Sequence, residues 1–426
     1  MSFSEWKAYT IEELGKVVTG KTPPTKDIEN FGNEYPFITP VDMNGQKNIY
    51  STARNLSEIG KEKVKNFLLP KNTVCVSCIG SDMGKVVKTT KPSVTNQQIN
   101  SIICYDDFDS DFVYYAMKLL SPTLRSIGHQ STAVPIINKT DFSGFEIYAP
   151  EDKEVQTRIA SILSSIDDAI ELNQQTNQTL EEIAKTLFKE WFVNFNYPNA
   201  TGEMQSTEMG DIPVGWKIEN IGELFDFVIG GDWGKDNEES IFSNYCTVIR
   251  GTDIPDILNS NLKSIPKRFI QESKLKTRRL QEGDIVFEIS GGSKDQATGR
   301  NLLITKEILN LFEAEVIPAS FCRLIRTKDI KTGCFLGVYL NCFYSEGGTW
   351  HYQLQSTGIS NFQFQVFASD HKIVVPPDDL INSFFELVQP IIKQIGENIS
   401  ENQTFFTLRD TLLPKLMKGE IEINGQ

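Results

Sequence analysis

The chain has 426 residues, 39% of them hydrophobic and 23% charged, and its formal net charge is −14. At roughly 100–200 residues per domain, this length predicts about two to four globular domains that can bury real cores. No run of about 18 apolar residues could span a membrane, and residues 1–10 lack the apolar core of a signal peptide. The seven scattered cysteines fit a reducing compartment better than a disulfide framework, so we expect a cytoplasmic protein without membrane association.

The negative charge is unevenly distributed along the chain. Nine of the fourteen excess acidic charges lie in residues 151–200 and 377–426, whereas residues 1–150 have 16 basic and 16 acidic side chains. A DNA-binding surface needs local Lys and Arg residues against the phosphate backbone. The overall charge therefore does not exclude a DNA binder, provided that its basic patches lie outside the two acidic segments.

Residues 1–150 are predicted to form a mixed, mostly β domain with a few helices. Short β-rich runs at 73–79, 99–104 and 145–148 alternate with turn residues. Cys75 and Cys78 have the spacing of a redox or zinc pair, but they lie inside a strand pattern with no second pair or nearby His. We interpret them as ordinary strand cysteines and expect no metal site.

The loop from Gly80 to Lys85 follows the first of these strands. It resembles a phosphate-binding loop, but it is one residue short and lacks the Ser or Thr after the Lys, so it is not a nucleotide site. Two interpretations stay open, a plain turn or a glycine-rich loop that approaches a DNA backbone. Lys85, Lys88 and Lys91 are candidates for phosphate contacts, with a merely solvated face as the alternative.

Residues 151–196 are predicted to form one long helix. Apolar residues recur at steps of four and three from Ile159 to Trp191, and Asn173 and Asn177 occupy two positions of this seam. A 3-4 repeat sustained over about four heptads is typical of a coiled coil.

A second long helix is predicted over residues 377–420, because the same seam recurs there at an offset of 225 residues. Asn398 and Asn402 occupy the positions that match the first Asn pair, and Pro390 inside the helix should kink it. We expect the two helices to form a coiled coil, with two amphipathic helices on separate cores as the alternative.

The stretch between the first helix and the second half, 197–215, is rich in Gly, Pro and Asn without a period, and we interpret it as a linker. Residues 216–376 then repeat the first domain. Trp216-Lys217 follows Trp6-Lys7 at an offset of 210, and residues 285–291 match 74–80 at an offset of 211. Such an ordered series at a nearly constant offset indicates a duplication, and therefore a second mixed, mostly β domain.

The second domain contains a dense basic cluster. A charge run is often only a solvated face, and contact with DNA phosphates is the competing interpretation. The candidate residues for these contacts are Lys263, Lys267, Arg268, Lys274, Lys276, Arg278 and Arg279.

No catalytic signature stands out anywhere in the chain. There is no glycine-rich cofactor fingerprint, no amino-methyltransferase motif, no nuclease pattern and no helicase Walker pair. The three histidines are too far apart in sequence to suggest a metal site. We expect a chain that is not an enzyme, with no catalytic residue, no metal and no cofactor of its own.

Several segments resemble type I restriction-modification specificity subunits. The helix sequences at 154–163, 180–192 and 408–421 resemble the spacer helices of that family, and Ile212-Pro213 with Gly215-Trp216 resembles the entry to its second recognition domain. Weaker similarities to recognition-domain motifs occur at 78–85, 96–98 and 318–321. The resemblance covers essentially the whole chain.

The resemblance implies a fold and a set of partners. Each recognition domain, 1–150 and 216–376, would read one half of a split double-stranded DNA target, and the two helices would pack antiparallel and set the distance between the halves. Two methyltransferase subunits with S-adenosylmethionine would dock on the chain and methylate adenine N6. Restriction subunits with ATP and Mg²⁺ would translocate and cleave the DNA.

Three alternatives stay open beside this function. The chain could serve a methylation-only complex without restriction subunits. It could also be a structural coiled-coil adaptor without a DNA role, or a diverged fused enzyme.

The seam also predicts a register for the helix pair. If the helices lie antiparallel about the centres of the two seams, the numbers of opposed residues sum to 575. Asn173 then faces Asn402, and Asn177 faces Asn398. Buried Asn at such positions lowers stability but fixes register, with splayed, solvated Asn residues as the alternative.

Overall fold

The computed structural model describes residues 6–129, 135–293, 296–356 and 359–421. The chain divides into two compact units, unit 1 (Met1–Glu171 with Phe405–Gln426) and unit 2 (Leu172–Thr404). Both units are α+β, with mixed sheets and segments of two 40-residue helices, α5 (Lys153–Phe192) and α11 (Asp378–Met417). Among the described residues, no helix is both long enough and apolar enough to cross a membrane.

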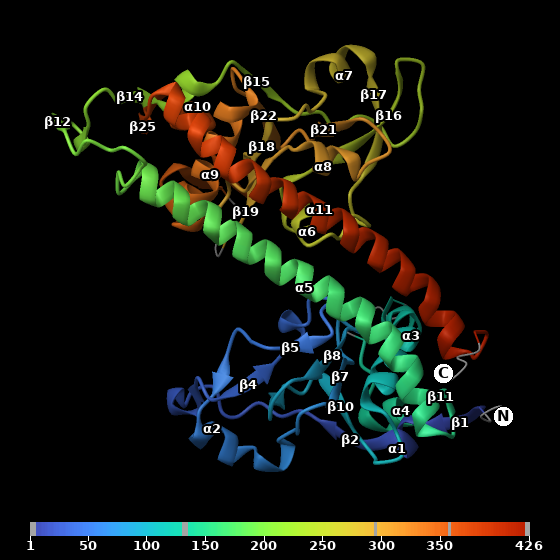
Figure 1. Ribbon diagram of the computed structural model, residues 1–426. Coiled ribbons are helices and arrows are strands. Elements are labelled where there is room, and N and C mark those ends of the chain that lie inside the picture. The colour runs from blue at the N-terminus through green and yellow to red at the C-terminus, as the bar shows by residue number, and fades with distance from the viewer. Residues whose placement is uncertain (1–5, 130–134, 294–295, 357–358, 422–426) are drawn as a thin grey trace. The chain divides into compact units, whose positions relative to one another are not determined.

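Unit 1 is built on a five-stranded sheet with the order β2-β10-β7-β8-β5, in which only the β5–β8 pair is parallel (Figure 1). Its strands are β2 (Gly15–Thr19), β5 (Asn48–Ile49), β7 (Val74–Ser77), β8 (Val86–Thr89) and β10 (Ile99–Cys104). A second sheet has the order β3-β6-β4-β9, with β3 (Phe31–Gly32), β4 (Tyr35–Ile38), β6 (Asn55–Leu56) and β9 (Val94–Thr95). β1 (Trp6–Thr10) pairs antiparallel with β11 (Glu146–Pro150). The 20-residue helix α3 (Ser110–His129) is accompanied by the short helices α1 (Ile11–Leu14), α2 (Glu58–Lys63) and α4 (Lys139–Ser143).

The main sheet of unit 1 is buried on both faces, so every residue of β7 and β8 is buried, including the polar residues Ser77, Lys88 and Thr89. Val74 and Val76 pack in the cluster that contains α3, whereas Cys75 packs on the opposite face with Val87. The first cluster also takes in side chains from the beginning of α5 and the end of α11, among them Leu163. These helix ends are therefore part of the core of unit 1.

Unit 2 contains a four-stranded sheet in the order β15-β22-β18-β20 and a three-stranded sheet in the order β17-β16-β21. Their strands are β15 (Phe227–Gly230), β16 (Phe242–Ile249), β17 (Lys267–Gln271), β18 (Ile285–Glu288), β20 (Asn301–Leu303), β21 (Val316–Pro318) and β22 (Cys322–Arg326). A smaller sheet has the order β19-β24-β23, with β19 (Ser290–Gly292), β23 (Gln353–Ser356) and β24 (Ile359–Phe362). Separately, β14 (Lys217–Asn220) pairs with β25 (Lys372–Val375). The helices besides α5 and α11 are α6 (Ile254–Leu258), α7 (Glu272–Arg278), α8 (Lys306–Asn310), α9 (Ile330–Ser345) and α10 (Phe364–Asp370).

The two units share an order of strand pairing. The sequence β2-β10-β7-β8 in unit 1 corresponds to β15-β22-β18-β20 in unit 2. Each unit also has an antiparallel pair that ends at a long helix. In unit 1, β1 pairs with β11, the strand just before α5. In unit 2, β14 pairs with β25, the strand just before α11. Each unit also contains one parallel pair of matching position, β4–β9 and β16–β21.

The structure differs from the sequence-based expectation in the segment between the two halves of the chain. Residues 197–215, expected to be an irregular linker, contain an antiparallel hairpin of β12 (Met204–Thr207) and β13 (Gly210–Pro213). The hairpin forms because Gly210 adopts a positive φ of 99° at its turn, which a glycine reaches without strain. Helix α11 remains continuous through Pro390.

Candidate nucleic-acid interface and helix pair

Basic and aromatic side chains lie on one face of the three-stranded sheet β17-β16-β21 in unit 2. Tyr245 on β16 and Phe269 on β17 are cross-strand partners with ring centroids 5.1 Å apart, and Tyr245 is 51% exposed. Lys267 lies two residues before Phe269 and is therefore on the same face, where it is exposed. Lys235 forms an isolated antiparallel bridge with Phe269 and is also exposed. We call these four residues the β16–β17 face.

Arg268 is held by contacts with the loop that precedes β16. Its guanidinium lies 4.6 Å from the ring centroid of Trp233, and its Nε donates a hydrogen bond of 3.0 Å to the Trp233 carbonyl. Asp236 forms an ion pair with the same guanidinium. Trp233 itself is 37% exposed. The Trp233–Arg268 pair is thus a cation–π contact in which the arginine is largely buried and the tryptophan is partly exposed.

The other basic residues predicted in this cluster lie on or near α7. Arg278 Nε donates 2.8 Å to the Gly230 carbonyl, and Arg279 forms an ion pair of 3.0 Å with Glu315. Lys276 is exposed and lies 3.9 Å from Glu272, while Lys263 is exposed and Lys274 is half-buried. Exposed ion pairs contribute little to the stability of a protein. Lys276 and Arg279 could therefore leave their glutamate partners and bind a DNA phosphate with little loss of stability.

Lys88 differs from the surface lysine that the sequence predicted. It is 4% exposed, and its ammonium forms an ion pair of 2.6 Å with Asp111. The ammonium is buried because β8 lies inside the sheet and α3 covers its end. Lys88 is therefore an internal residue of unit 1, and we remove it from the candidate phosphate contacts.

The Gly80–Lys85 loop is a tight turn between β7 and β8. Its Lys85 backbone N–H donates 2.9 Å to Ser77 Oγ, and the Lys85 ammonium contacts Asp82 at 2.8 Å and the Pro40 carbonyl at 3.0 Å. A Cβ added at Gly84, where φ is +85°, would lie 2.8 Å from the Ser121 carbonyl on α3. The plain-turn interpretation accounts for these contacts, and of the three predicted lysines only Lys91 is fully on the surface.

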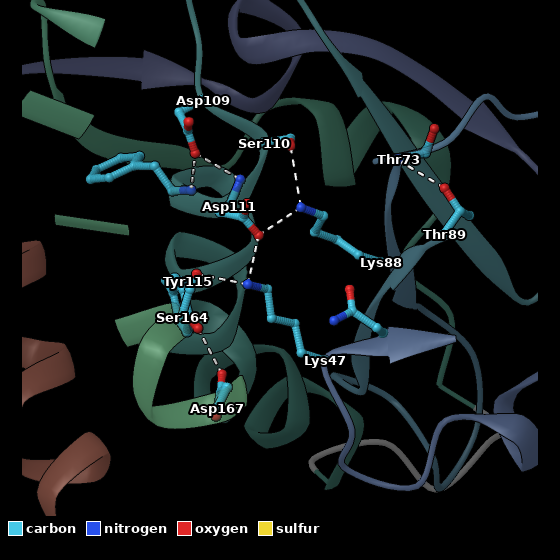
Figure 2. Close-up of polar contacts among 12 residues, drawn as sticks. Lys47, Thr73, Lys88, Thr89, Asp109, Ser110, Asp111, Tyr115, Ser164 and Asp167 are labelled. Carbon is cyan, nitrogen blue, oxygen red and sulfur yellow. Dashed lines mark hydrogen bonds and ion pairs between the residues drawn. The ribbon is translucent and has the colours of Figure 1, made fainter. Parts of the chain in front are cut away.

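A buried polar network instead connects the sheet of unit 1 with α3 and α5 (Figure 2). Asp111 accepts from both Lys47, at 2.8 Å, and Lys88, and the Lys47 ammonium donates 2.7 Å to Ser164 on α5. Burial alone would raise the pKa of Asp111, but the two ammonium groups outweigh it and hold the pKa below its ordinary value. Both buried ammonium groups share the Asp111 carboxylate, and Lys47 also reaches Ser164, so the network joins the sheet to α3 and α5.

The middle of the helix pair lies in unit 2, and the structure brings the four Asn residues together there. Asn173 Nδ2 donates 3.0 Å to Asn402 Oδ1, and Asn398 Nδ2 donates 2.7 Å to Asn177 Oδ1. Asn177, Asn398 and Asn402 are buried, at 5%, 6% and 0% exposure. The Asn177 amide oxygen accepts from Asn398, and its amide nitrogen donates to the Ile395 carbonyl at 3.3 Å. Both ends of this buried amide therefore have a hydrogen-bond partner.

Other contacts of α5 and α11 follow the same register in each unit. In unit 2 the rings of Trp191 and Phe384 are 5.9 Å apart. In unit 1 Ile159 and Leu416 belong to one core cluster, and Arg409 forms an ion pair of 2.8 Å with Asp167. The two Asn–Asn hydrogen bonds, the Trp191–Phe384 ring contact and the Arg409–Asp167 ion pair each join residues whose numbers sum to 575 or 576.

Sequence reasoning missed the buried ion pairs. Lys47 and Asp111 are 64 residues apart, and no local pattern relates them. The Arg409–Asp167 pair could have been found, because the 575 register places Arg409 opposite Ile166, one residue from Asp167. In unit 2 a Glu288–Arg300 ion pair was also missed; Glu288 is fully buried there, at the position that Ser77 occupies in the first repeat.

The cysteines are structural in character. Cys75 lies in β7 and Cys78 directly after it, both buried, and burial raises the pKa of Cys75 to about 12 and that of Cys78 to about 11. Thiols with such raised pKa values are poor nucleophiles and metal ligands at neutral pH. The described residues contain no cluster of three or more His, Cys, Asp or Glu that could hold a metal ion.

Comparison with known proteins gives consistent matches. The family model described as "Type I restriction modification DNA specificity domain" matches residues 3–182. The Type I restriction enzyme MjaIX specificity subunit of Methanocaldococcus jannaschii is 29% identical over 98% of this chain and 94% of that protein. The Type I restriction enzyme HindI specificity subunit of Haemophilus influenzae is 35% identical over 43% of this chain and 40% of that protein.

A solved structure has the same fold. The type I restriction-modification S subunit from M. genitalium covers 99% of this chain and 97% of its own, with a TM-score of 0.56 and 16% sequence identity. Residues 3–182 thus match a DNA specificity domain of type I restriction modification. Over 98% of its length the chain is similar to a type I restriction enzyme specificity subunit, and it has the fold of a solved S subunit.

Proposed function

We propose that this chain reads a bipartite double-stranded DNA target, with one half-site contacted by unit 1 and the other by unit 2. The shared order of strand pairing in the two units supports this, because two similar domains are suited to two half-sites. The helix pair would hold the half-sites at a fixed spacing. The observation that carries the proposal is the pair of Asn–Asn hydrogen bonds, since they join α5 and α11 in one antiparallel register.

The DNA-facing surface of unit 2 would be the β16–β17 face together with the Trp233–Arg268 pair and the cations of α7. Basic side chains position a protein on phosphates, whereas base edges are read by a few side chains of well-defined geometry. Lys267, Lys263 and Lys276, which are exposed, would contact phosphates, as would Arg278 and Arg279 once they exchange their internal partners. Arg268 would meet DNA only on the opposite face of β17 from Lys267 and only after releasing Asp236, because its side chain is 12% exposed and is held by Trp233 and Asp236.

The chemistry of the system would lie in partner subunits. Two methyltransferase subunits that use S-adenosylmethionine would bind the chain and methylate adenine N6, and restriction subunits that use ATP and Mg²⁺ would join them. The relatives' names as specificity subunits of restriction enzymes support this assignment. Two similar units can each seat one copy of an identical partner.

A methylome of the host with and without this gene tests the proposal. We expect one split adenine-methylated motif to disappear when the gene is deleted and to return when it is restored. Replacing residues 1–150 by the same region of another specificity subunit should change one half of the motif and preserve the other half. A motif in which both halves change together, or a methylome unaffected by the deletion, would contradict the proposal.

A further inference from the structure

Unit 1 contains an aromatic cluster on its second sheet, and cations lie over several of its rings. The aromatic members of this cluster are Phe31, Tyr35, Phe37 and Phe67. Phe37 is buried, whereas the other three are only partly buried. The Lys21 ammonium is 5.4 Å from the Phe67 ring centroid, and the Lys61 ammonium is 5.2 Å from that of Tyr35. The cluster therefore holds cations at the surface of unit 1 through cation–π contacts.

Arg54, which directly precedes β6, lies over two of these rings. Its guanidinium carbon is 5.6 Å from the ring centroid of Phe31 and 5.5 Å from that of Phe37. The backbone around it is also fixed, because the Phe37 N–H donates 3.1 Å to the Arg54 carbonyl and the Ala53 N–H donates 2.8 Å to Asp42 Oδ1. Arg54 is nevertheless an exposed residue. Its side chain is thus held in place and open to solvent at the same time.

The Arg54 guanidinium has no acidic partner. In the parts of the chain that the structure describes, it forms no ion pair within 4 Å and no side-chain hydrogen bond. Asp42 reaches the same loop, but it is buried and accepts from the N–H groups of Ala53 and Thr39. The donors of Arg54 are therefore available to a ligand without the loss of an internal contact.

The other arginines of unit 1 lack this combination. Arg409 forms an ion pair of 2.8 Å with Asp167, and Arg158 lies 3.8 Å from Glu154. Arg125 on α3 is exposed and has no acid within 4 Å, but no ring contact or side-chain hydrogen bond to it occurs among the described residues. Of the described arginines in unit 1, only Arg54 is both oriented and without a partner.

The chemistry of a guanidinium indicates what such a side chain would bind. Its planar fork of N–H donors matches the O6 and N7 acceptors of guanine in the major groove, whereas adenine has an acceptor and a donor on this edge. A phosphate contact needs charge but no fixed orientation, and flexible lysines suffice for it. The two rings that orient Arg54 therefore favour a base contact over a phosphate contact.

We propose that Arg54 reads a guanine in the half-site of unit 1, with its fork of donors on N7 and O6. The inference rests on the function proposed above, because it requires that unit 1 contacts DNA. It gives unit 1 a base contact at a surface that the buried Lys88 does not reach.

The experiment uses the complex of the full chain with its methyltransferase subunits. The exchange of residues 1–150 first assigns one half of the methylated motif to unit 1. Duplexes then carry 7-deazaguanine, which lacks only the N7 acceptor, at each guanine of that half in turn. The ratio of initial methylation rates on unmodified and modified duplexes measures the sensitivity to N7 at each position. For the native chain we expect one guanine at which this ratio is at least about fivefold.

The variant Arg54→Gln should bring the ratio at that guanine close to one and leave the ratios at the other positions unchanged. Arg54→Lys retains the charge without the planar fork, so we expect an intermediate ratio at the same position and a higher overall rate than that of Arg54→Gln. Arg125→Gln is the matched control, since it removes an exposed arginine of unit 1 that no ring orients, and it should keep the native ratio.

Two kinds of negative result are distinguishable. If the exchange of residues 1–150 changes neither half of the motif, the function proposed above fails and this inference fails with it. If the exchange changes one half, three outcomes overturn the role of Arg54 alone. These are a half without guanine on either strand, a native complex insensitive to 7-deazaguanine at every position, and a native ratio that persists in both Arg54 variants.

Discussion

Lys267 and Lys276 are exposed cations of the candidate DNA surface with little competition from neighbouring acids. Lys267 has no ion pair within 4 Å among the described residues, and Lys276 is 3.9 Å from Glu272 at high exposure. We expect the double variant Lys267→Gln with Lys276→Gln to flatten the slope of log affinity against log salt by about 2 in the assembled complex, because each lost phosphate contact removes roughly 0.9.

The salt titration needs a variant with the same loss of charge elsewhere. Lys393 on α11 and Lys418 beyond it are exposed, and neutralising both removes two charges from the helical part of the chain. This control should leave the slope unchanged. Equal slopes for the native complex and the Lys267, Lys276 variant would show that the cluster is only a solvated face.

His371 is a second residue with a measurable consequence. Its Nε2 and Nδ1 are hydrogen-bonded to the hydroxyls of Tyr339, at 2.5 Å, and Tyr352, at 3.0 Å, within a cluster of aromatic rings. Burial lowers the pKa of His371 to about 4. The unfolded chain, with a His pKa of about 6.5, takes up this proton first, so the local stability of unit 2 falls as the pH drops from about 6.5 to about 4.

Hydrogen exchange of peptides that cover α10 measures this effect. Between pH 6.5 and pH 5 we expect the local stability to fall by roughly 1–2 kcal/mol, less than the full shift implies because the ring is only partly buried. His371→Phe removes the titrating group, and we expect its α10 peptides to lose less protection over the same interval. Parallel losses in the native chain and the variant would contradict the role of His371.

At the scale of elements, the Asn177–Asn398 hydrogen bond is one of the buried polar contacts that join α5 and α11. Replacing only Asn398 by Leu leaves the buried Asn177 amide without this partner, which we expect to cost about 1–3 kcal/mol. The double variant Asn177→Leu with Asn398→Leu should recover most of that stability, since it leaves neither amide unpaired.

Thermal unfolding of the four chains of this double-mutant cycle gives the coupling between the two residues. Gln178→Leu, an exposed change next to Asn177, is the control and should have little effect. Additive effects of the two single variants would mean that the amides do not stabilise the register together.

The sequence was enough to predict which residues of α5 and α11 face each other. It was not enough to predict which lysines are buried and which are exposed. A seam with period 3.5 specifies which residues of a long helix meet a partner, because the geometry is local and repeats. Lys88 and Lys91, by contrast, are three residues apart and look alike in sequence. What separates them is Asp111, 23 residues from Lys88, which becomes a neighbour only after α3 folds onto the sheet.

At the scale of the whole molecule, we expect the two 40-residue helices to set the spacing of the proposed half-sites. Inserting one heptad near residue 175 and one near residue 400 lengthens both helices by about 10 Å while it preserves the seam. At roughly 3.4 Å per base pair, we expect the non-specific spacer of the methylated motif to grow by about three base pairs.

Sequencing of methylated DNA from cells with the lengthened chain measures the spacer. A heptad inserted in α5 alone is the control, because it shifts one helix against the other and separates the Asn pairs. We expect that chain to lose methylation. An unchanged spacer in the matched insertion would exclude the helix pair as the element that sets the spacing.

The four central amides have a further consequence for how cells inherit a methylation pattern. Amide groups do not change their charge across the pH range in which proteins fold, and a hydrogen bond between them is screened by salt far less than an exposed ion pair is. The two Asn–Asn hydrogen bonds are therefore insensitive to acidification and to salt, whereas the Arg409–Asp167 ion pair between the same helices is not. If the chain reads DNA as proposed, we expect cells grown in acid or in high salt to carry methyl marks of the same spacing.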